Sequence, residues 1–256
     1  MAKPLVSIVT PTFGRAAFLP LVYTCVKQQS WPALEWLVED DSPEPSQFMQ
    51  QLREPWVIYR HTRSRHSVGH KRNTLVGRAN GEYIAHFDDD DYYSPHYVSH
   101  MMELLLLQRA DICKLSGFFL LHRNLGTFAY WDLLVKTGIH FVWTEGSIKA
   151  HFLSDHDNLR LANSQYGFGF SYVYKKSIWY RTGFPDLNWN EDAAFVHAAG
   201  QDISIKMIPD RIGLCLHLVH NESTSRCFPQ FLLPRFLLDH LFSSAGTYLE
   251  GIGPKT

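Results

Sequence analysis

Four consecutive aspartates, Asp88 to Asp91, follow an apolar run from Tyr83 to Phe87 and are the most chemically distinctive feature of the sequence. Adjacent carboxylates repel each other by about 1 kcal/mol in water and several-fold more in a partly dry cleft, so the run predicts a bound cation. Carboxylate oxygens suit Mg²⁺ or Mn²⁺, which takes one or two carboxylates together with substrate phosphates. Alternate residues of an extended segment point the same way, so Asp88 and Asp90 share one side. The run therefore indicates a divalent-ion site for a phosphate-bearing substrate, with a solvated acidic turn as the alternative.

The elements that would position these aspartates alternate between strand and helix. The predicted strands are apolar runs typical of a parallel sheet buried on both faces: Leu5 to Thr10, Leu34 to Glu39, Val57 to Arg60 and Tyr83 to Phe87. The predicted helices between them run from Phe18 to Val26, from about Ser46 to Arg53 and from Lys71 to Ala79. This alternation predicts a doubly wound α/β sheet with right-handed crossovers.

Polar residues follow three of these strands at their carboxyl ends, where ligands collect in such sheets. Thr10-Pro11-Thr12 ends the first strand, Asp40-Asp41 follows the second, and the aspartate run follows the strand that ends at Phe87. We therefore expect hydroxyls and carboxylates from three strands at one edge of the sheet.

The second half of the chain lacks this regular alternation and predicts a mixture of helix and strand. No element is assigned from Trp131 to Tyr166. The predicted helices are a segment after Pro95 that ends near Arg109, then Lys176 to Arg181, Glu191 to Ala199, and about Gln230 to Phe242 with Pro234 inside it. The predicted strands are Asp111 to Leu121 and Thr127 to Trp131, as a hairpin, then Gly167 to Tyr174, Ile203 to Ile208 and Ile212 to His220.

Composition excludes several classes of protein. The 256 residues, 45% of them hydrophobic, are enough for one domain with a sizeable core. Lys and Arg number 24 against 25 Asp and Glu, so there is no basic excess for a nucleic-acid partner. No apolar run reaches the roughly 18 to 20 residues of a membrane-spanning helix, and the start of the sequence lacks a secretory signal. These features predict a cytoplasmic protein, and its four scattered cysteines predict buried thiols rather than disulfides.

Several motifs, taken in order, resemble the family 2 inverting glycosyltransferases of the GT-A fold. They are Ser-Ile-Val-Thr-Pro-Thr-Phe from Ser7, Asp-Asp-Ser from Asp40, Lys-Arg-Asn from Lys71, the segment from Gly81 to Asp91, and Asn-Glu-Asp from Asn190. The match is close over about residues 4–100 and looser over 165–210. The resemblance implies a mixed, mainly parallel, Rossmann-like central sheet with helices on both faces and a small C-terminal acceptor-side subregion. It implies one GT-A domain over residues 1–256, with a nucleotide-sugar half (about 1–100), an acceptor and catalytic-base half (about 101–220) and a closing loop and helix (about 221–256).

The resemblance assigns donor-binding roles to residues at the sheet edge. Thr10 and Pro11 would line a uracil and ribose pocket, and Asp41 would accept a hydrogen bond from the uracil ring. For these residues a helix cap or an Asx turn is the alternative. Lys71 and Arg72 would offset the charge of the diphosphate, although a solvated helix face also accounts for Lys71.

The same resemblance assigns the metal site. Asp88 and Asp89 would hold the ribose and the metal, and Asp90 would contact the metal directly. His220 would be a third metal ligand or a phosphate contact, with a structural histidine as the alternative. The residues after it, Asn221 to Ser225, resemble a loop that closes over the diphosphate.

Catalysis would depend on the acidic pair that opens a predicted helix. By the resemblance, Asp192 is the general base that takes the proton of the acceptor hydroxyl, and a single displacement inverts the anomeric carbon. Glu191 would contact the acceptor. The alternative for both is that they complement the N-terminus of the helix.

These assignments lead to a metal-dependent glycosyltransferase that uses Mn²⁺ or Mg²⁺ and a nucleotide-sugar donor, a UDP-sugar foremost. The acceptor, a glycan, lipid, protein or small molecule, would dock on an aromatic-rich region, although core packing also explains these side chains: Trp131, Trp143, Tyr166, Phe168 and Trp189. The last helix is a packing element, a peripheral membrane contact or a contact in a homo-oligomer. The competing functions are a sugar-nucleotidyltransferase and a non-catalytic module that binds a nucleotide sugar.

Overall fold

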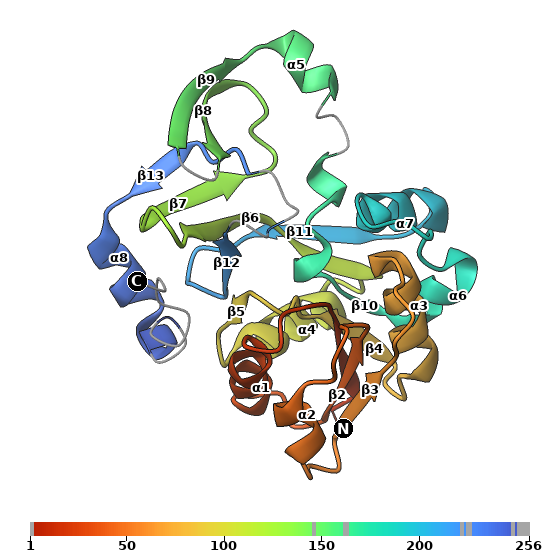
Figure 1. Ribbon diagram of the computed structural model, residues 1–256. Helices are drawn as coiled ribbons and strands as arrows, with labels where there is room; N and C mark the ends of the chain where they lie inside the picture. Colours follow the sequence, from red (N-terminus) through yellow and green to blue (C-terminus); the bar gives the residue numbers. More distant parts are fainter. Residues whose placement is uncertain are drawn as a thin grey trace.

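The computed structural model describes residues 3–144, 147–160, 164–220, 223, 227–246 and 249. Within these residues a curled, mixed eleven-stranded sheet forms the centre of the molecule, and a separate two-stranded sheet projects from one end (Figure 1). Most of the main sheet follows the order β13-β7-β6-β10-β4-β1-β2-β3. The predicted α/β class, with a mixed central sheet, is confirmed.

The first half of the sheet consists of four parallel strands in the order β4-β1-β2-β3: β1 (Val6–Thr12), β2 (Leu34–Asp40), β3 (Val57–His61) and β4 (Tyr83–His86). All four were predicted, but β1 continues through Pro11 to Thr12, two residues further than expected. Proline is tolerated there because β4 pairs with β1 only as far as Val9, so no neighbouring strand on that side requires the missing N–H.

Helices cover both faces of the sheet, as predicted. Alternate residues of β1 divide between two hydrophobic cores, with Ile8 in one and Val9 in the other. The first core contains residues of α1 (Leu19–Lys27) and α4 (Tyr97–Leu107), and the second contains residues of α3 (Val68–Arg78), α6 (Lys176–Thr182) and α7 (Glu191–Ala199). Helix α2 (Gln47–Gln51) and helix α3 begin after serine caps, and the cap of α3, Ser67, moves its start before the predicted Lys71.

The second half of the sheet is built around a long buried strand, β6 (Ile112–His122). It forms the predicted antiparallel hairpin with β7 (Thr127–Asp132), and β10 (Val173–Lys175) joins it to β4. The remaining strands pair with this half of the sheet: β5 (Tyr92–Tyr93), β11 (Ile205–Pro209), β12 (Cys215–Val219) and β13 (Phe231–Leu233).

The segment that could not be assigned from sequence contains the projecting hairpin, made of β8 (Gly138–Thr144) and β9 (Ser147–Leu153), and helix α5 (Asp155–Arg160). Short 3-10 helices follow: η1 (Ser164–Tyr166), η2 (Gly169–Ser171) and, near the C-terminus, η3 (Ser243–Ala245). The predicted subdivision at about residues 100 and 220 stays a prediction.

Two predicted elements were wrong. The strand expected from Gly167 to Tyr174 is instead η2 followed by the three residues of β10, and Phe168 adopts a positive φ of 63° that an extended strand does not allow. The helix expected from Gln230 to Phe242 is divided at Pro234, which is extended and caps α8 (Arg235–Leu241), while β13 pairs with β7 before it. A proline lacks the N–H that a helix interior requires, so the helix begins only after it.

Candidate active site

Two of the four aspartates in the run lie close to one arginine. Arg15, in the turn after β1, places Nη1 2.8 Å from Asp89 Oδ1 and 2.7 Å from Asp90 Oδ2. Asp90 Oδ2 also lies 2.9 Å from His220 Nε2. Burial acts to raise the pKa of Asp90, but His220 and Arg15 outweigh it and lower that pKa. Burial raises the pKa of Asp89 to about 6 despite Arg15.

Asp91 has a structural position. Its fully buried carboxylate lies 2.8 Å from His217 Nδ1 and accepts the backbone N–H of Leu218 at 2.9 Å, both on β12. Burial acts to lower the pKa of His217, but the charge of Asp91 outweighs it and holds that pKa well above its ordinary value. Asp91 therefore attaches the acidic run to the neighbouring strand β12.

Asp88 contacts a different arginine, Arg72, and its side chain is about one-third exposed. Its Oδ1 lies 3.4 Å from Arg72 Nη2, and Arg72 Nε donates to Glu191 Oε1 at 3.2 Å. Burial raises the pKa of Asp88 to about 7, with Arg72 opposing and the other aspartates adding to the rise. Arg72, in the first turns of α3, thus connects the acidic run to the start of α7.

The predicted base-binding acid, Asp41, has a completely buried side chain. Its carboxylate accepts hydrogen bonds from Lys71 Nζ, Arg65 Nη1 and the backbone N–H of His66, each at 2.7 Å. Burial acts to raise the pKa of Asp41, but these donors outweigh it and lower that pKa. Arg65 also lies over the face of Phe13, 3.4 Å from the ring centroid. The carboxylate of Asp41 is therefore occupied by three donors of the protein itself.

The Asx turn, which was the alternative to base binding at the Asp40-Asp41 pair, is made by only one of the two aspartates. Asp40 makes the Asx turn, because its Oδ1 accepts the backbone N–H of Ser42 at 2.9 Å. In the first strand, Thr10 is fully buried and its hydroxyl accepts Trp36 Nε1 at 3.0 Å, and the hydroxyl of Thr12, also buried, interacts with Asp89. Neither threonine is exposed at the sheet edge.

The predicted catalytic base is held by backbone groups. Asp192, 8% exposed, lies in the first turn of α7, and its Oδ2 accepts the N–H of Gly169 at 2.6 Å while its Oδ1 accepts the N–H of Ala193 at 2.7 Å. A Cβ on Gly169 would lie only 2.8 Å from Asp192 Cβ. Only glycine lets the backbone approach this carboxylate so closely.

Two further side chains hold the segments around this base. Lys114, buried on β6, donates from Nζ to the carbonyls of Gln165 at 2.5 Å and Gly167 at 2.6 Å, in the segment that leads to Gly169. Burial lowers the pKa of Lys114 to about 7, with the charge of Asp192 opposing. Asn73 bonds both to the carbonyl and to the N–H of Phe184, just before α7.

Sequence reasoning missed Arg15, Arg65 and Lys114 as site residues. A signal was present for Lys114, since it is a single charge inside the apolar strand from Ile112 to Leu121 and a buried lysine needs partners. No comparable signal marks the two arginines, because arginine on a polar loop is ordinary.

The donor atoms of the acidic run suit a hard divalent ion. Among the described residues, no three His, Cys, Asp or Glu side chains form a closed metal site. Of the predicted set, Asp90 and His220 are in contact, whereas Asp88 contacts Arg72. A cationic nitrogen, Nη1 of Arg15, lies between the carboxylates of Asp89 and Asp90. Such ions bind through one or two carboxylates plus substrate phosphates, so Asp89 and Asp90, beside His220, fit one. The predicted closing loop, Asn221 to Ser225, lies outside the described residues apart from Ser223.

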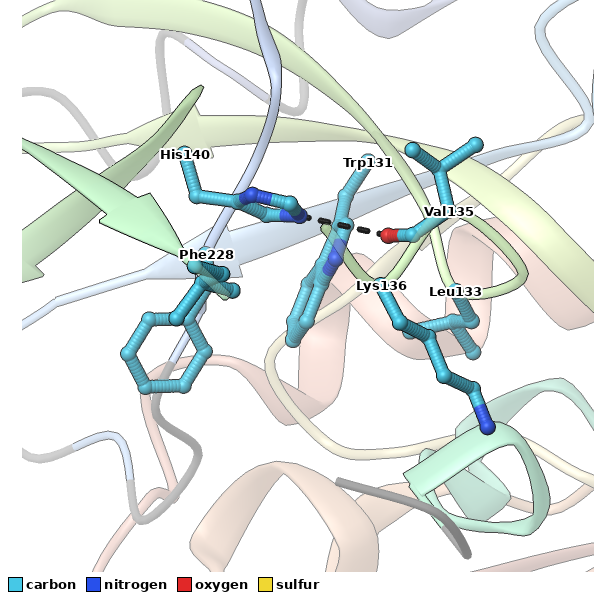
Figure 2. Close-up of a pocket in the computed structure, with 7 residues that line it drawn as sticks. Trp131, Leu133, Val135, Lys136, His140 and Phe228 are labelled. Carbon is cyan, nitrogen blue, oxygen red and sulfur yellow. Dashed lines mark hydrogen bonds between the residues drawn. The ribbon is translucent and has the colours of Figure 1, made fainter. Parts of the chain in front are cut away.

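The aromatic residues expected to bind an acceptor mostly pack in the core. Trp131 and Trp143 are buried, whereas Trp189 is 73% exposed, three residues before Asp192. A small pocket lies between β7, β8 and the chain near Phe228 (Figure 2). It is lined by seven residues: Trp131, Leu133, Val135, Lys136, His140, Leu153 and Phe228. His140 is fixed there, with Nε2 3.2 Å from the carbonyl of Val135.

Comparison with known proteins connects these features. Residues 7–125 match the family model described as glycosyl transferase family 2. The chain is 29% identical over 111 residues to the Escherichia coli K12 protein described as the colanic acid biosynthesis glycosyl transferase WcaA, covering 40% of each chain. It is 28% identical over 128 residues to the Bacillus subtilis 168 protein described as the teichuronic acid biosynthesis glycosyltransferase TuaG, covering 48% of this chain and 50% of that protein. The chain thus spans half or less of the length of these relatives.

Solved structures share the fold. Staphylococcus aureus TarS, as residues 1–349 in complex with UDP-GlcNAc, superposes with a TM-score of 0.61 at 16% identity, over 86% of this chain and 60% of that one. The mannosyltransferase PcManGT of Pyrobaculum calidifontis, in complex with GDP-Man and Mn²⁺, gives a TM-score of 0.60 at 16% identity over 86% of this chain and 59% of that one.

No helix in the described part of the chain is long and apolar enough to cross a membrane. The family match and the shared fold support the expectation of a glycosyltransferase enzyme. The resemblance seen in the sequence is confirmed: the chain has a GT-A fold, and its residues 7–125 match the model of glycosyl transferase family 2.

Proposed function

We propose that the chain is a metal-dependent, inverting glycosyltransferase that moves a sugar from a nucleotide diphosphate, UDP foremost, to an acceptor hydroxyl. The observation that carries this proposal is the position of Arg72, which contacts both Asp88 and Glu191. Arg72 and Glu191 are 119 residues apart in the sequence, yet Arg72 contacts both Glu191 and Asp88, which supports a single site for the acidic run and the Glu191-Asp192 pair. A sugar transferase needs such an arrangement, with a diphosphate site and a base beside each other.

The donor side of the site combines anionic and cationic groups. Lys71, Arg72 and Arg15 lie against the carboxylates of Asp41, Asp88 and Asp89 respectively, so positive charge is available for a diphosphate. The TarS and PcManGT complexes with UDP-GlcNAc and with GDP-Man support a nucleotide-sugar donor. Phe13 and Arg65, stacked beside Asp41, offer flat faces for the base.

Asp89 and Asp90 would hold the divalent ion, with His220 on the Asp90 carboxylate. When bound, Mn²⁺ or Mg²⁺ would stabilise the negative charge of the leaving diphosphate. The Mn²⁺ in the PcManGT complex supports this assignment.

Asp192 would act as the general base. Each of its two oxygens accepts one backbone N–H, which fixes the carboxylate while leaving lone pairs for the acceptor hydroxyl. Removal of the hydroxyl proton lets the acceptor oxygen attack the anomeric carbon directly, and one displacement gives inversion. Glu191, bonded to Arg72, would orient this region and contact the acceptor.

The test begins with a screen of UDP-, GDP- and dTDP-sugars for Mn²⁺-dependent hydrolysis and thermal shift, followed by acceptors of the glycan, lipid, protein and small-molecule classes. Asp192→Asn should lower turnover by about 10²- to 10⁴-fold and leave UDP affinity within about twofold. Asp202→Asn, at an exposed ion pair with Arg181, is the matched control and should change neither.

Each outcome separates the competing functions. Binding of UDP-sugars without turnover by the wild type would support a binding module, and release of pyrophosphate from a nucleoside triphosphate and a sugar phosphate would support a nucleotidyltransferase. Response only to GDP or dTDP donors would refute the assignment of uracil. Cytoplasmic location with peripheral membrane contact, and self-association, are further proposals that fractionation and size-exclusion chromatography would test.

A further inference from the structure

Arg15 occupies the place where a cation meets the acidic run. A single nitrogen, Nη1, bridges the carboxylates of two adjacent residues at 2.8 Å and 2.7 Å. The side chains of Asp89 and Asp90 are only 5% and 8% exposed, and that of Arg15 is 19% exposed. Charge-assisted contacts at this distance, in a largely dry setting, are stronger than those of an exposed ion pair.

Every carboxylate of the run already has a partner from the protein itself. Asp88 contacts Arg72, Asp89 and Asp90 contact Arg15, Asp90 also contacts His220, and Asp91 contacts His217. The repulsion within the run is therefore relieved without an added ion. A divalent ion that binds Asp89 and Asp90 must compete with the guanidinium for the same oxygens.

The chain around Arg15 allows its side chain to leave. Arg15 follows Gly14, whose φ is 68°, in a turn whose side chains at Phe13 and Ala16 are exposed. Two hydrogen bonds of the turn do not involve the guanidinium, from the N–H of Gly14 to Ser42 Oγ and from the N–H of Phe18 to the carbonyl of Arg15. These two bonds can remain when the guanidinium moves away.

We propose that Arg15 is a resident counter-ion that competes with the divalent ion at Asp89 and Asp90, so that the ion is captured together with a diphosphate. The diphosphate contributes the phosphate oxygens that complete the shell of the ion, and it gives the displaced guanidinium a new anionic partner. This inference rests on the proposed function for the identity of the anion, but the competition itself is a property of the protein and the ion.

The experiment measures Mn²⁺ binding to the protein alone, from the electron paramagnetic resonance signal of free Mn²⁺, with no nucleotide present. Arg15→Gln should bind Mn²⁺ at least about tenfold more tightly than the wild type, because it removes the competing charge. Arg15→Lys, which keeps a charge, should stay close to the wild type. Arg181→Gln, which breaks the exposed pair with Asp202, is the matched control and should bind like the wild type.

The location of the ion is tested in the same background. Adding Asp90→Asn to Arg15→Gln should abolish the gain in Mn²⁺ affinity. If Arg15→Gln binds Mn²⁺ no more tightly than the wild type, or if the gain survives Asp90→Asn, the proposal is overturned.

Loss of the arginine leaves two buried, adjacent carboxylates without their shared cation, so we expect Arg15→Gln to be less stable when no divalent ion is bound. In that case Mn²⁺ should raise its melting temperature by more than it raises that of the wild type, and an equal or smaller rise overturns the proposal. None of these readouts depends on sugar transfer. Failure of the donor screen would therefore refute the proposed function and leave the competition standing, and the reverse also holds.

Discussion

Substitution of Gly169 by alanine should displace the proposed catalytic base without removing it. The new Cβ would lie 2.8 Å from Asp192 Cβ, and ordinary contact begins at 3.4 Å, so the two groups must separate by about 0.6 Å. The same movement lengthens the 2.6 Å hydrogen bond from Gly169 N to Asp192 Oδ2. A misplacement of 1 Å can cost about 10²-fold in rate, so we expect turnover to fall by roughly tenfold to a hundredfold.

The assay is steady-state turnover of the donor found in the screen, with donor affinity measured separately by calorimetry. Because the diphosphate side of the site is untouched, donor affinity should stay within about twofold. Overpacking should lower the free energy of unfolding by about 1–3 kcal/mol, measured by urea denaturation.

Gly77→Ala is the matched control for Gly169→Ala. Its Cβ would meet only the ring of Trp179 at 3.5 Å, an ordinary contact, on the exposed side of α3. It should keep full turnover and gain about 0.5–1 kcal/mol of stability from better helix propensity. If folded Gly169→Ala turns over as fast as Gly77→Ala, the backbone does not position Asp192 as we infer.

Two further predictions concern buried charges. Burial lowers the pKa of Lys114 to about 7 from 10.5, so between these pH values the unfolded chain binds more protons and the stability of the wild type rises with pH. Lys114→Met should lose this contribution, so its urea-unfolding free energy should rise less from about pH 7 to about pH 10. Equal slopes for the variant and the wild type would contradict the prediction. Asp91→Asn leaves the buried His217 without its carboxylate and should lower the free energy of unfolding by about 3–5 kcal/mol in the same assay. The exposed control, Asp202→Asn, should lower it by less than about 1 kcal/mol. Similar losses for the two variants would show that the buried pair is not what attaches the acidic run to β12.

The first half of the fold was predictable because its signals are local. Four apolar runs separated by helix patterns need no knowledge of distant contacts, and β1 to β4 formed where they were expected. The errors came where a distant partner decides the outcome. Residues 231–233 are helix-compatible by composition, but pairing with β7 makes them a strand. Likewise the 167–174 segment turns at Phe168 because the chain must pass Asp192 and Lys114.

The candidate site shows the same division. The sequence indicated Asp88 to Asp91 and Asp192 as the groups able to do chemistry, since closely spaced carboxylates at the end of a buried strand or at the start of a helix cost free energy unless they have a partner. Residue type and spacing did not distinguish the four aspartates, and their separate roles were only implied by the resemblance, because their side-chain partners come from distant parts of the chain. Asp91 faces His217, Asp88 faces Arg72, and Asp89 shares Arg15 with Asp90.

The sequence by itself determined the α/β class, the sheet edge that carries the polar groups and the acids that we assign to the site, because these follow from residue type and spacing, whereas the fold family followed from the resemblance of its motifs. Only the tertiary structure decided which cation each acid meets, since an ion pair depends on distances between atoms that the chain brings together from far apart. Arg15 lies 75 residues from Asp90, and Lys71 lies 30 residues from Asp41. Spacing along the sequence carries no record of such contacts.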